Sequence, residues 1–262
     1  MATRKQFEKA ITEKCKKPNI KGYFLNNTEN LLDGIDKELF QEELMKGSGN
    51  ELKSKFNAIF SSSALAVNNF AIVKKHLKDF KYFDYSKFYN PQFERQFKTG
   101  LGGTPPNLDF TIENNETVIA FESKYLETLN KKKAKFVDSY NKENLNYLDD
   151  LWFTLIKKYK NVNLHLDVAQ LIKHSIGLIN HKRNNPEQAV ILVYLYWTPD
   201  NYDNFPNYIQ HQKELIEFKE DIKKSKDLKF MSLTYNEFWN LYDNSVFNEH
   251  FDRMRNKYKI II

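Results

Sequence analysis

The sequence predicts an α/β fold in which a mixed central β-sheet is flanked by helices, with an N-terminal helical addition. Three features predict it: a hairpin-like stretch near the middle of the chain, one long apolar strand, and helical patterns around them. Strands and helices mixed in this way are typical of layered α/β domains. No repeat or linker divides the 262 residues, so we expect a single domain over residues 1–262, with helices in about 1–90 and the α/β core in about 91–262.

The N-terminal part has apolar residues at helical spacing. Residues 1–22 contain one short amphipathic pattern, and residues 28–46 contain an acid-rich one that ends at a Gly-Ser-Gly break. A further helix is expected to begin near Asn50, which is a suitable N-cap residue. The next helix is expected to end near Leu77.

The α/β core is expected to follow in the order strand, hairpin, two helices, strand, helix, strand, helix. The continuous apolar run near residue 190 predicts a central strand that is covered on both faces. Thr234 and Glu237 have the spacing of a capping box and predict the start of the last long helix. The expected ranges before that helix are 92–98, 109–112, 117–121, 144–160, 167–178, 188–197, 208–225 and 228–233.

Three charged residues of the hairpin form the candidate site. Residues two apart on a strand project to the same face, so Glu122 and Lys124 are expected to lie together. A closed hairpin would bring Asp109 beside them. Two converging carboxylates supply the hard oxygen ligands that Mg²⁺ prefers, and the amine would stabilise negative charge nearby. The alternative is that Glu122 and Lys124 form an ordinary surface ion pair at the end of a strand.

This pattern resembles the PD-(D/E)XK nuclease superfamily, which has the restriction-endonuclease-like fold. The Pro-Asp element is loosened to residues 105–109, Pro-Pro-Asn-Leu-Asp, and the second element is Glu122-Ser123-Lys124. The resemblance covers roughly residues 92–235, with the N-terminal helices as a variable addition. It implies hydrolysis of DNA phosphodiester bonds, with Asp109 and Glu122 as ligands of one or two Mg²⁺ ions and Lys124 as a catalytic group.

The resemblance also implies accessory residues on the neighbouring elements. A glutamate on a helix before the sheet often completes such sites, and Glu51 is the candidate for this catalytic and metal-binding role. Glu51 can equally be a first-turn residue that favours the helix dipole, and Glu94 is a second candidate. The helix after the Glu-x-Lys strand often contributes a glutamine or a basic residue, so Gln170 and Lys173 are expected to support the site. His174 is expected to be a capped surface imidazole.

Basic residues just beyond the hairpin are candidates for DNA binding. Lys131, Lys132 and Lys133 follow the Glu-x-Lys strand, where they would meet a phosphate backbone. A solvated loop is an equally good interpretation of this cluster. The net charge of +6 and the isoelectric point of about 9.0 favour an anionic partner only mildly.

The absence of several well-known motifs excludes other classes of protein. His-Glu-x-x-His, Gly-x-Ser-x-Gly and a phosphate-binding Gly-Lys-Ser/Thr loop are all missing. The single cysteine, Cys15, excludes an internal disulfide and a cysteine zinc cluster, and it favours the cytosol. We expect no signal peptide, because no apolar stretch follows the first residues, and no membrane span.

The leading interpretation is therefore a cytoplasmic, magnesium-dependent, sequence-specific type II restriction endonuclease that cuts double-stranded DNA as a homodimer. Two alternatives stay open. One is a less specific defence or repair nuclease of the same fold. The other is a nucleic-acid-binding module without catalysis.

Overall fold

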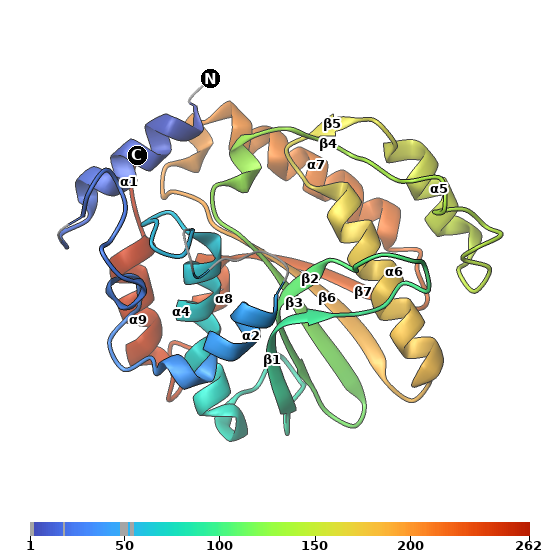
Figure 1. Cartoon of the computed structure of the whole chain (residues 1–262), viewed down its shortest axis with the longest axis horizontal. Coiled ribbons are helices and arrows are strands. Elements are labelled where there is room, and N and C mark those ends of the chain that lie inside the picture. The colour runs from blue at the N-terminus through green and yellow to red at the C-terminus, as the bar shows by residue number, and fades with distance from the viewer. Residues whose placement is uncertain (1–2, 18, 48–51, 53–54) are drawn as a thin grey trace.

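A computed structural model describes residues 3–17, 19–47, 52 and 55–262. Its centre is a mixed five-stranded sheet with the strand order β1-β2-β3-β6-β7 (Figure 1). The first three strands form an antiparallel meander, and β6 and β7 then run parallel to β3. The strands are β1 (Tyr89–Gln96), β2 (Asn107–Glu113), β3 (Thr117–Lys124), β6 (Ala189–Tyr196) and β7 (Lys229–Thr234).

Strands β3 and β6 form the buried centre of the sheet. Every residue of β3 is buried, and in β6 only Ala189 is exposed. The apolar composition of β6 explains this position, because a strand covered on both faces needs apolar residues at successive positions. The prediction of a central strand at residues 188–197 is therefore confirmed.

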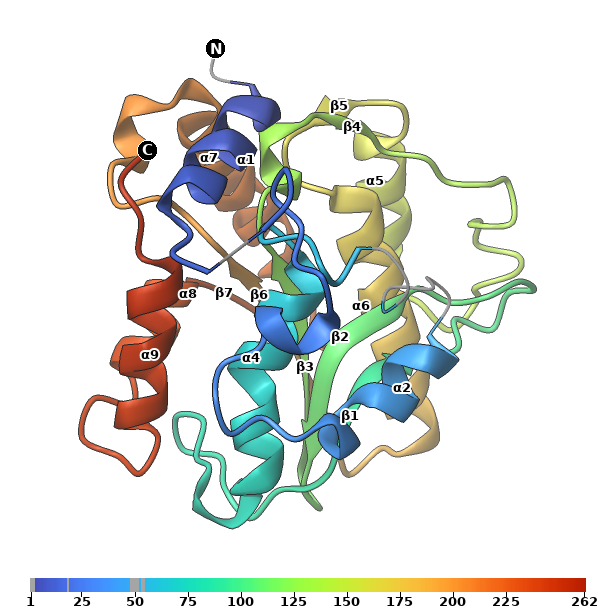
Figure 2. The same ribbon diagram turned by 60° about the vertical axis from the view of Figure 1, so that its left-hand side comes forward.

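Helices cover both faces of the sheet (Figure 2). The cluster on one face includes residues of α1, α4, α8 and α9, and the cluster on the other includes residues of α5, α6 and α7. The expected α/β architecture with flanking helices is thus confirmed. The helices are α1 (Arg4–Lys14), α2 (Gln41–Lys46), α4 (Ser62–Lys75), α5 (Asp150–Tyr159), α6 (Val168–Asn184), α7 (Pro206–Ile222), α8 (Tyr235–Asn240) and α9 (Asn248–Tyr258).

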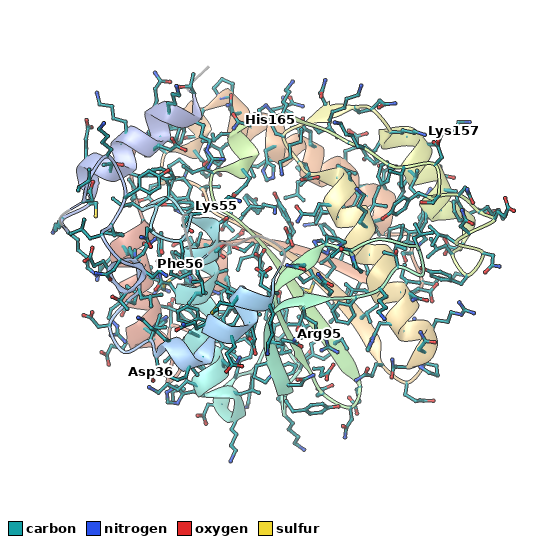
Figure 3. All side chains as sticks on the ribbon, viewed as in Figure 1. Asp36, Lys55, Phe56, Arg95, Lys157 and His165 are labelled. Atoms are coloured by element: carbon teal, nitrogen blue, oxygen red, sulfur yellow. The ribbon has the colours of Figure 1, made fainter. Side chains whose placement is uncertain are left out.

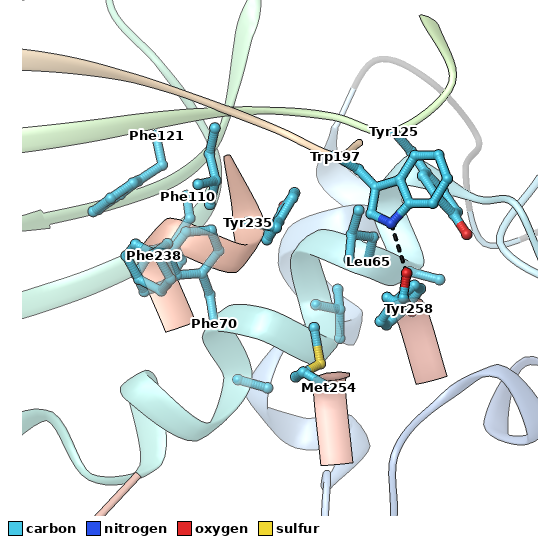
Figure 4. Packing of buried hydrophobic residues seen from close by; sticks show 14 of the residues in the cluster. Leu65, Phe70, Phe110, Phe121, Tyr125, Trp197, Tyr235, Phe238, Met254 and Tyr258 are labelled. Carbon is cyan, nitrogen blue, oxygen red and sulfur yellow. Dashed lines mark hydrogen bonds between the residues drawn. The ribbon is translucent and has the colours of Figure 1, made fainter. Parts of the chain in front are cut away.

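Side chains fill the space between these layers (Figure 3). On the α4 face, Phe70 stacks on Phe110 with 4.5 Å between ring centroids. At the far end of the same cluster, the Trp197 indole donates a hydrogen bond to the Tyr258 carbonyl at 2.7 Å (Figure 4). Burial of this many aromatic rings supplies much of the hydrophobic stabilisation of the domain.

Several predicted elements differ from the structure. Strand β1 spans Tyr89–Gln96 instead of 92–98, with an irregular register between Tyr89 and Gln92. Residues 55–60 form turns and a bridge, not a helix, because long-range backbone hydrogen bonds to Gly22 and Phe24 hold this segment. Residues 28–46 contain 3-10 turns, η1 (Asn27–Asn30) and η2 (Lys37–Leu39), before the short helix α2.

The C-terminal part also differs in one respect. The predicted capping box is present, with the Thr234 hydroxyl accepting from the Glu237 amide at 3.1 Å. The helix that it starts, α8, ends after six residues, and the chain turns before α9 begins. Across the described residues, no helix has the length and apolar character needed to cross a membrane.

Candidate active site

Asp109 lies at the point where strands β2 and β3 stop pairing. The antiparallel register runs from Glu113 opposite Val118 to Phe110 opposite Phe121. At the next position the Asp109 carboxylate accepts a hydrogen bond from the Ser123 amide, at 2.7 Å. A side chain thus replaces the backbone acceptor of the neighbouring strand, and the aspartate is held beside the residue between Glu122 and Lys124.

Glu122 and Lys124 form a buried ion pair. Their exposed fractions are 1% and 8%, and the Lys124 amine donates a short hydrogen bond to Glu122 Oε1. Ser123 projects to the other face, where its hydroxyl lies 2.6 Å from the Tyr235 hydroxyl of helix α8. The alternation expected for a strand is therefore present. The alternative of an exposed surface pair is excluded, because both charged side chains are buried.

His174 of helix α6 supplies the second partner of Glu122. Its Nε2 atom lies 3.0 Å from Glu122 Oε2, and the imidazole is buried. The expectation of a surface imidazole was wrong, because α6 turns this position toward the sheet. A periodic signal was available: Leu171, His174 and Leu178 are three and four residues apart, so they share one buried face of the helix.

The charges of this cluster perturb one another. Burial alone would raise the pKa of Glu122, but Lys124 and His174 outweigh it and lower the pKa to about 2. Burial would lower the pKa of Lys124, yet Glu122 and Asp109 raise it above its usual value. The pKa of Asp109 is raised well above its usual value by burial and then by the neighbouring Glu122. Opposed pKa shifts among neighbouring charged residues are typical of functional sites.

Glu94 is the acid that approaches Asp109 from strand β1. The pairs Phe93–Phe110 and Arg95–Leu108 place Glu94 opposite Asp109, and its charge contributes to the raised pKa of that aspartate. Its backbone adopts φ 54°, a left-handed conformation that costs energy for any residue other than glycine. The other accessory candidate, Glu51, lies outside the described residues.

The two predicted supporting residues of α6 lie differently from His174. The Lys173 amine sits over the rings of Phe136 and Tyr140, 5.8 Å from each centroid. Gln170 is half-buried, and within the described part of the chain no hydrogen bond links its amide to Asp109, Glu122 or Lys124. The contact between α6 and the acidic cluster therefore comes from the histidine.

The family of the chain agrees with this geometry. A model of the family described as restriction endonuclease associating with ARP matches residues 4–259. The chain belongs to this restriction endonuclease family. No curated protein and no solved structure matches the chain. The family match also includes α1 and α4, so the N-terminal helices belong to this family's own sequence.

In this member of the family, the basic cluster lies on a small second sheet. Lys132 and Lys133 form β4, which pairs with β5 (Asn163–Leu164). All three lysines of residues 131–133 are exposed. Lys132 pairs with Asp167 at 2.8 Å, so two of the three have no acidic partner among the described residues.

The acidic cluster fits a divalent cation in its donor chemistry. Among the described residues, no group of three or more His, Cys, Asp or Glu side chains has the spacing of a metal site. Mg²⁺ needs fewer protein ligands, since one or two carboxylates with water and substrate phosphate complete its shell. Asp109 and Glu122 provide two such carboxylates. The pKa of Asp109 is raised first by burial and then by the charge of Glu122, and a cation would offset both effects.

Proposed function

We propose that the protein is a magnesium-dependent endonuclease that hydrolyses DNA phosphodiester bonds, and more specifically a sequence-specific type II restriction endonuclease that acts as a homodimer. The observation that carries the proposal is the cluster of half-buried Asp109 with buried Glu122 and Lys124 in a chain of a restriction endonuclease family. Buried charges cost free energy, and their retention at one sheet end is best explained by chemistry.

Asp109 and Glu122 would hold the metal ion, with Glu94 or Glu51 as a further acid. When bound, Mg²⁺ polarises the scissile phosphate and lowers the pKa of a bound water. Such a site would resemble the PD-(D/E)XK arrangement, here with Asp109 fixed by the Ser123 amide. His174 orients the Glu122 carboxylate by contacting its second oxygen.

Lys124 would act as a charged donor. Its pKa is raised because the acids favour the ammonium form more than burial disfavours it. A lysine that stays protonated is a poor general base, so its role is to donate hydrogen bonds to the attacked phosphate or the leaving oxygen. With a cation held by Asp109 and Glu122, the Lys124 amine would be free to leave Glu122 and to donate to the substrate.

DNA binding would rest on exposed cations outside this cluster. Lys131, Lys132 and Lys133 lie beyond the strand that ends in Lys124. Contacts of this kind release counterions and make binding depend on salt. The family's description names an association with ARP, and we expect this chain to work with that partner.

Digestion of a sequenced phage genome with Mg²⁺, with and without ARP, tests the proposal. A type II enzyme should give discrete bands whose mapped ends share one short sequence. Asp109→Asn should give none. A smear with random ends would favour the less specific nuclease instead. Binding without cleavage, in either the presence or absence of ARP, would leave the non-catalytic module as the better interpretation.

A further inference from the structure

A cavity lies away from the acidic cluster, where the end of helix α1 meets the end of helix α9. Its volume is about 820 Å³, which falls in the range of small-molecule sites. Both helices lie on the same side of the molecule, at the left of Figure 1. The proposed nuclease mechanism makes no use of this cavity.

The lining of the cavity carries excess positive charge. Two of the lining residues are acidic, Asp33 and Asp200, against seven basic ones. Four of the basic residues are exposed and pair with no acidic side chain in the described part of the chain: Lys14, Lys16, Lys17 and Lys259. The full basic set is Lys14, Lys16, Lys17, Arg253, Arg255, Lys257 and Lys259.

Lys257 is the most unusual of these cations. Its amine donates to the backbone carbonyl and to the side-chain oxygen of Asn30, with no carboxylate partner in the described residues. Burial and the nearby Lys17 lower its pKa to about 7. Asn30 is fixed in turn, because its amide donates to the carbonyls of Phe56 and Ala58, at 2.7 Å each. The amine is therefore held on a rigid support without a counter-charge.

Arg253 adds a second incompletely paired cation. Its Nη1 atom donates to the Asp33 carbonyl at 3.1 Å, whereas its buried Nε atom has no partner within the described residues. Buried polar atoms are nearly always hydrogen-bonded, so an orphan donor in a cavity wall indicates a missing acceptor. An anion near Lys257 and Arg253 would satisfy both the charge and the donor.

The rest of the wall is apolar and partly aromatic. Phe24, Tyr125 and Tyr258 line the cavity together with aliphatic residues. Tyr125 and Tyr258 pack edge to face, 5.8 Å between centroids, at the end of the cluster drawn in Figure 4. A simple inorganic anion would leave this wall unused. A ligand with an apolar ring and an anionic group would use both parts.

We propose that this cavity binds a nucleotide, with its phosphates against Lys257, Arg253 and Lys259 and its base against the apolar wall. The same chemistry is offered by a free nucleotide and by the phosphorylated end of a DNA strand. Tyr125 directly follows Lys124 on the chain, so the cavity adjoins the strand of the candidate active site. The proposal nevertheless stands on binding alone and does not depend on cleavage.

Isothermal titration calorimetry of the full chain tests the site with four probes: pyrophosphate, ADP, adenosine, and a short 5′-phosphorylated oligonucleotide. ADP should bind at least about tenfold more tightly than adenosine and than pyrophosphate, because each lacks one half of the contacts. Lys257→Met should weaken ADP binding by about tenfold or more. Lys224→Met, at an exposed lysine beyond helix α7, should leave it unchanged.

A second variant keeps the test decisive if Lys257→Met fails to fold. Lys259 is exposed, so Lys259→Glu should preserve the thermal unfolding midpoint and still weaken ADP binding. Tighter binding of the oligonucleotide than of ADP assigns the site to a strand end, and the reverse assigns it to a free nucleotide. Equal affinities for ADP and adenosine, or ADP binding that neither variant changes, would overturn the proposal. Failure of all four probes to bind at millimolar concentration would also overturn it.

Discussion

His174 Nε2 lies 3.0 Å from Glu122 Oε2, and this contact joins helix α6 to strand β3. Because Lys124 occupies the other oxygen, both oxygens of the Glu122 carboxylate lie close to a side-chain nitrogen. The histidine has no role in the proposed hydrolysis except through this carboxylate. It is therefore a positioning residue, and substitution should change how the site handles metal more than how it binds DNA.

His174→Ala should raise the Mg²⁺ concentration needed for half-maximal cleavage by about 10–100-fold, since residues that orient a metal ligand typically contribute that much. His174→Gln keeps a donor near Glu122 Oε2 and should recover most of the loss. The measurement is single-turnover cleavage against Mg²⁺ concentration, beside thermal unfolding. A His174→Ala protein that is less stable but has an unchanged Mg²⁺ dependence would show that the imidazole is only a packing residue.

Asp109→Asn should stabilise the metal-free protein and abolish its response to metal. The asparagine keeps the acceptor for the Ser123 amide but removes the charge that faces Glu122 and Glu94. The pKa of Asp109 is raised in the folded state, so the folded protein binds more protons, and the free energy of unfolding falls as pH rises above about 4. That loss should be smaller in the variant.

Thermal unfolding at pH 7, with and without Ca²⁺ or Mg²⁺, measures both effects of Asp109→Asn. The wild type should gain stability when the ion is added, because an ion that binds only the folded state shifts the equilibrium. The unfolding temperature of Asp109→Asn should be higher than that of the wild type without the ion, and it should rise little when the ion is added. An equal gain in both proteins would mean that the ion binds elsewhere.

The sequence predicted the strands of the site better than its helices. Alternation and the Glu-Ser-Lys ending located β3 correctly, because strand periodicity is a local property. The pairing of β3 with β6 joins Thr117 to Ala189, and no local pattern encodes such a contact. The prediction of a helix over residues 55–60 was wrong for the same reason. Long-range hydrogen bonds to Gly22 and Phe24 take the place of the expected helical ones.

Helix α6 shows that the sequence could not predict which side chains of a helix reach the site. Chain order pointed to α6, which contacts Glu122 through His174, but the resemblance to the nuclease superfamily favoured Gln170 and Lys173 over His174. The position of Lys173 depends on Phe136 and Tyr140, which lie more than thirty residues away in a loop. Which polar residue of a helix reaches the sheet is thus decided by long-range packing. The roles of Asp109 and Glu122 in metal binding stay predictions.

Gly177→Ala should destabilise the protein by about 1–3 kcal/mol, the usual cost of overpacking. A Cβ atom at this position of α6 would lie 2.4 Å from the Phe97 carbonyl oxygen, so the helix or the end of β1 must shift. Gly102→Ala is the matched control, because its Cβ would meet no atom within 4 Å. Urea denaturation measures both. Equal stability of the two variants would contradict the close approach of α6 to the sheet.

Lys257 should make stability rise with pH above neutrality. Its folded-state pKa is lowered to about 7, mainly by burial, whereas the unfolded value is near 10.4. Between these values the unfolded chain holds the proton and the folded protein does not, so the free energy of unfolding increases by up to about 1.4 kcal/mol per pH unit.

Urea denaturation at pH 7, 8 and 9 tests this linkage by comparison with Lys257→Met. Other titrating groups contribute to both proteins and cancel in the difference between them. The wild type should therefore gain stability relative to the variant as pH rises. Parallel pH profiles would mean that the Lys257 amine keeps its proton in the folded protein.

Lys124→Ala should reduce the single-turnover cleavage rate by about 10²–10⁴-fold, the usual cost of losing a positioned donor or charge-stabilising group. DNA affinity should change little, because binding is distributed over many phosphate contacts and one lysine is a small share of them. Lys131→Ala and Lys132→Ala should do the reverse, weakening binding and its salt dependence with little effect on the chemical step. Titrations in Ca²⁺ measure affinity without cleavage.

The comparison separates catalysis from binding because only interactions that strengthen in the transition state change the rate of the bound complex. Lys124 is buried against Glu122, whereas Lys131 and Lys132 are exposed, so a fold defect is more probable in the first variant, and its thermal unfolding must be measured. Removal of the amine leaves the Glu122 charge with His174 as its remaining partner. Near-normal cleavage by a folded Lys124→Ala protein would reduce Glu122-Ser123-Lys124 to an ordinary strand end and remove the main support for the proposed mechanism.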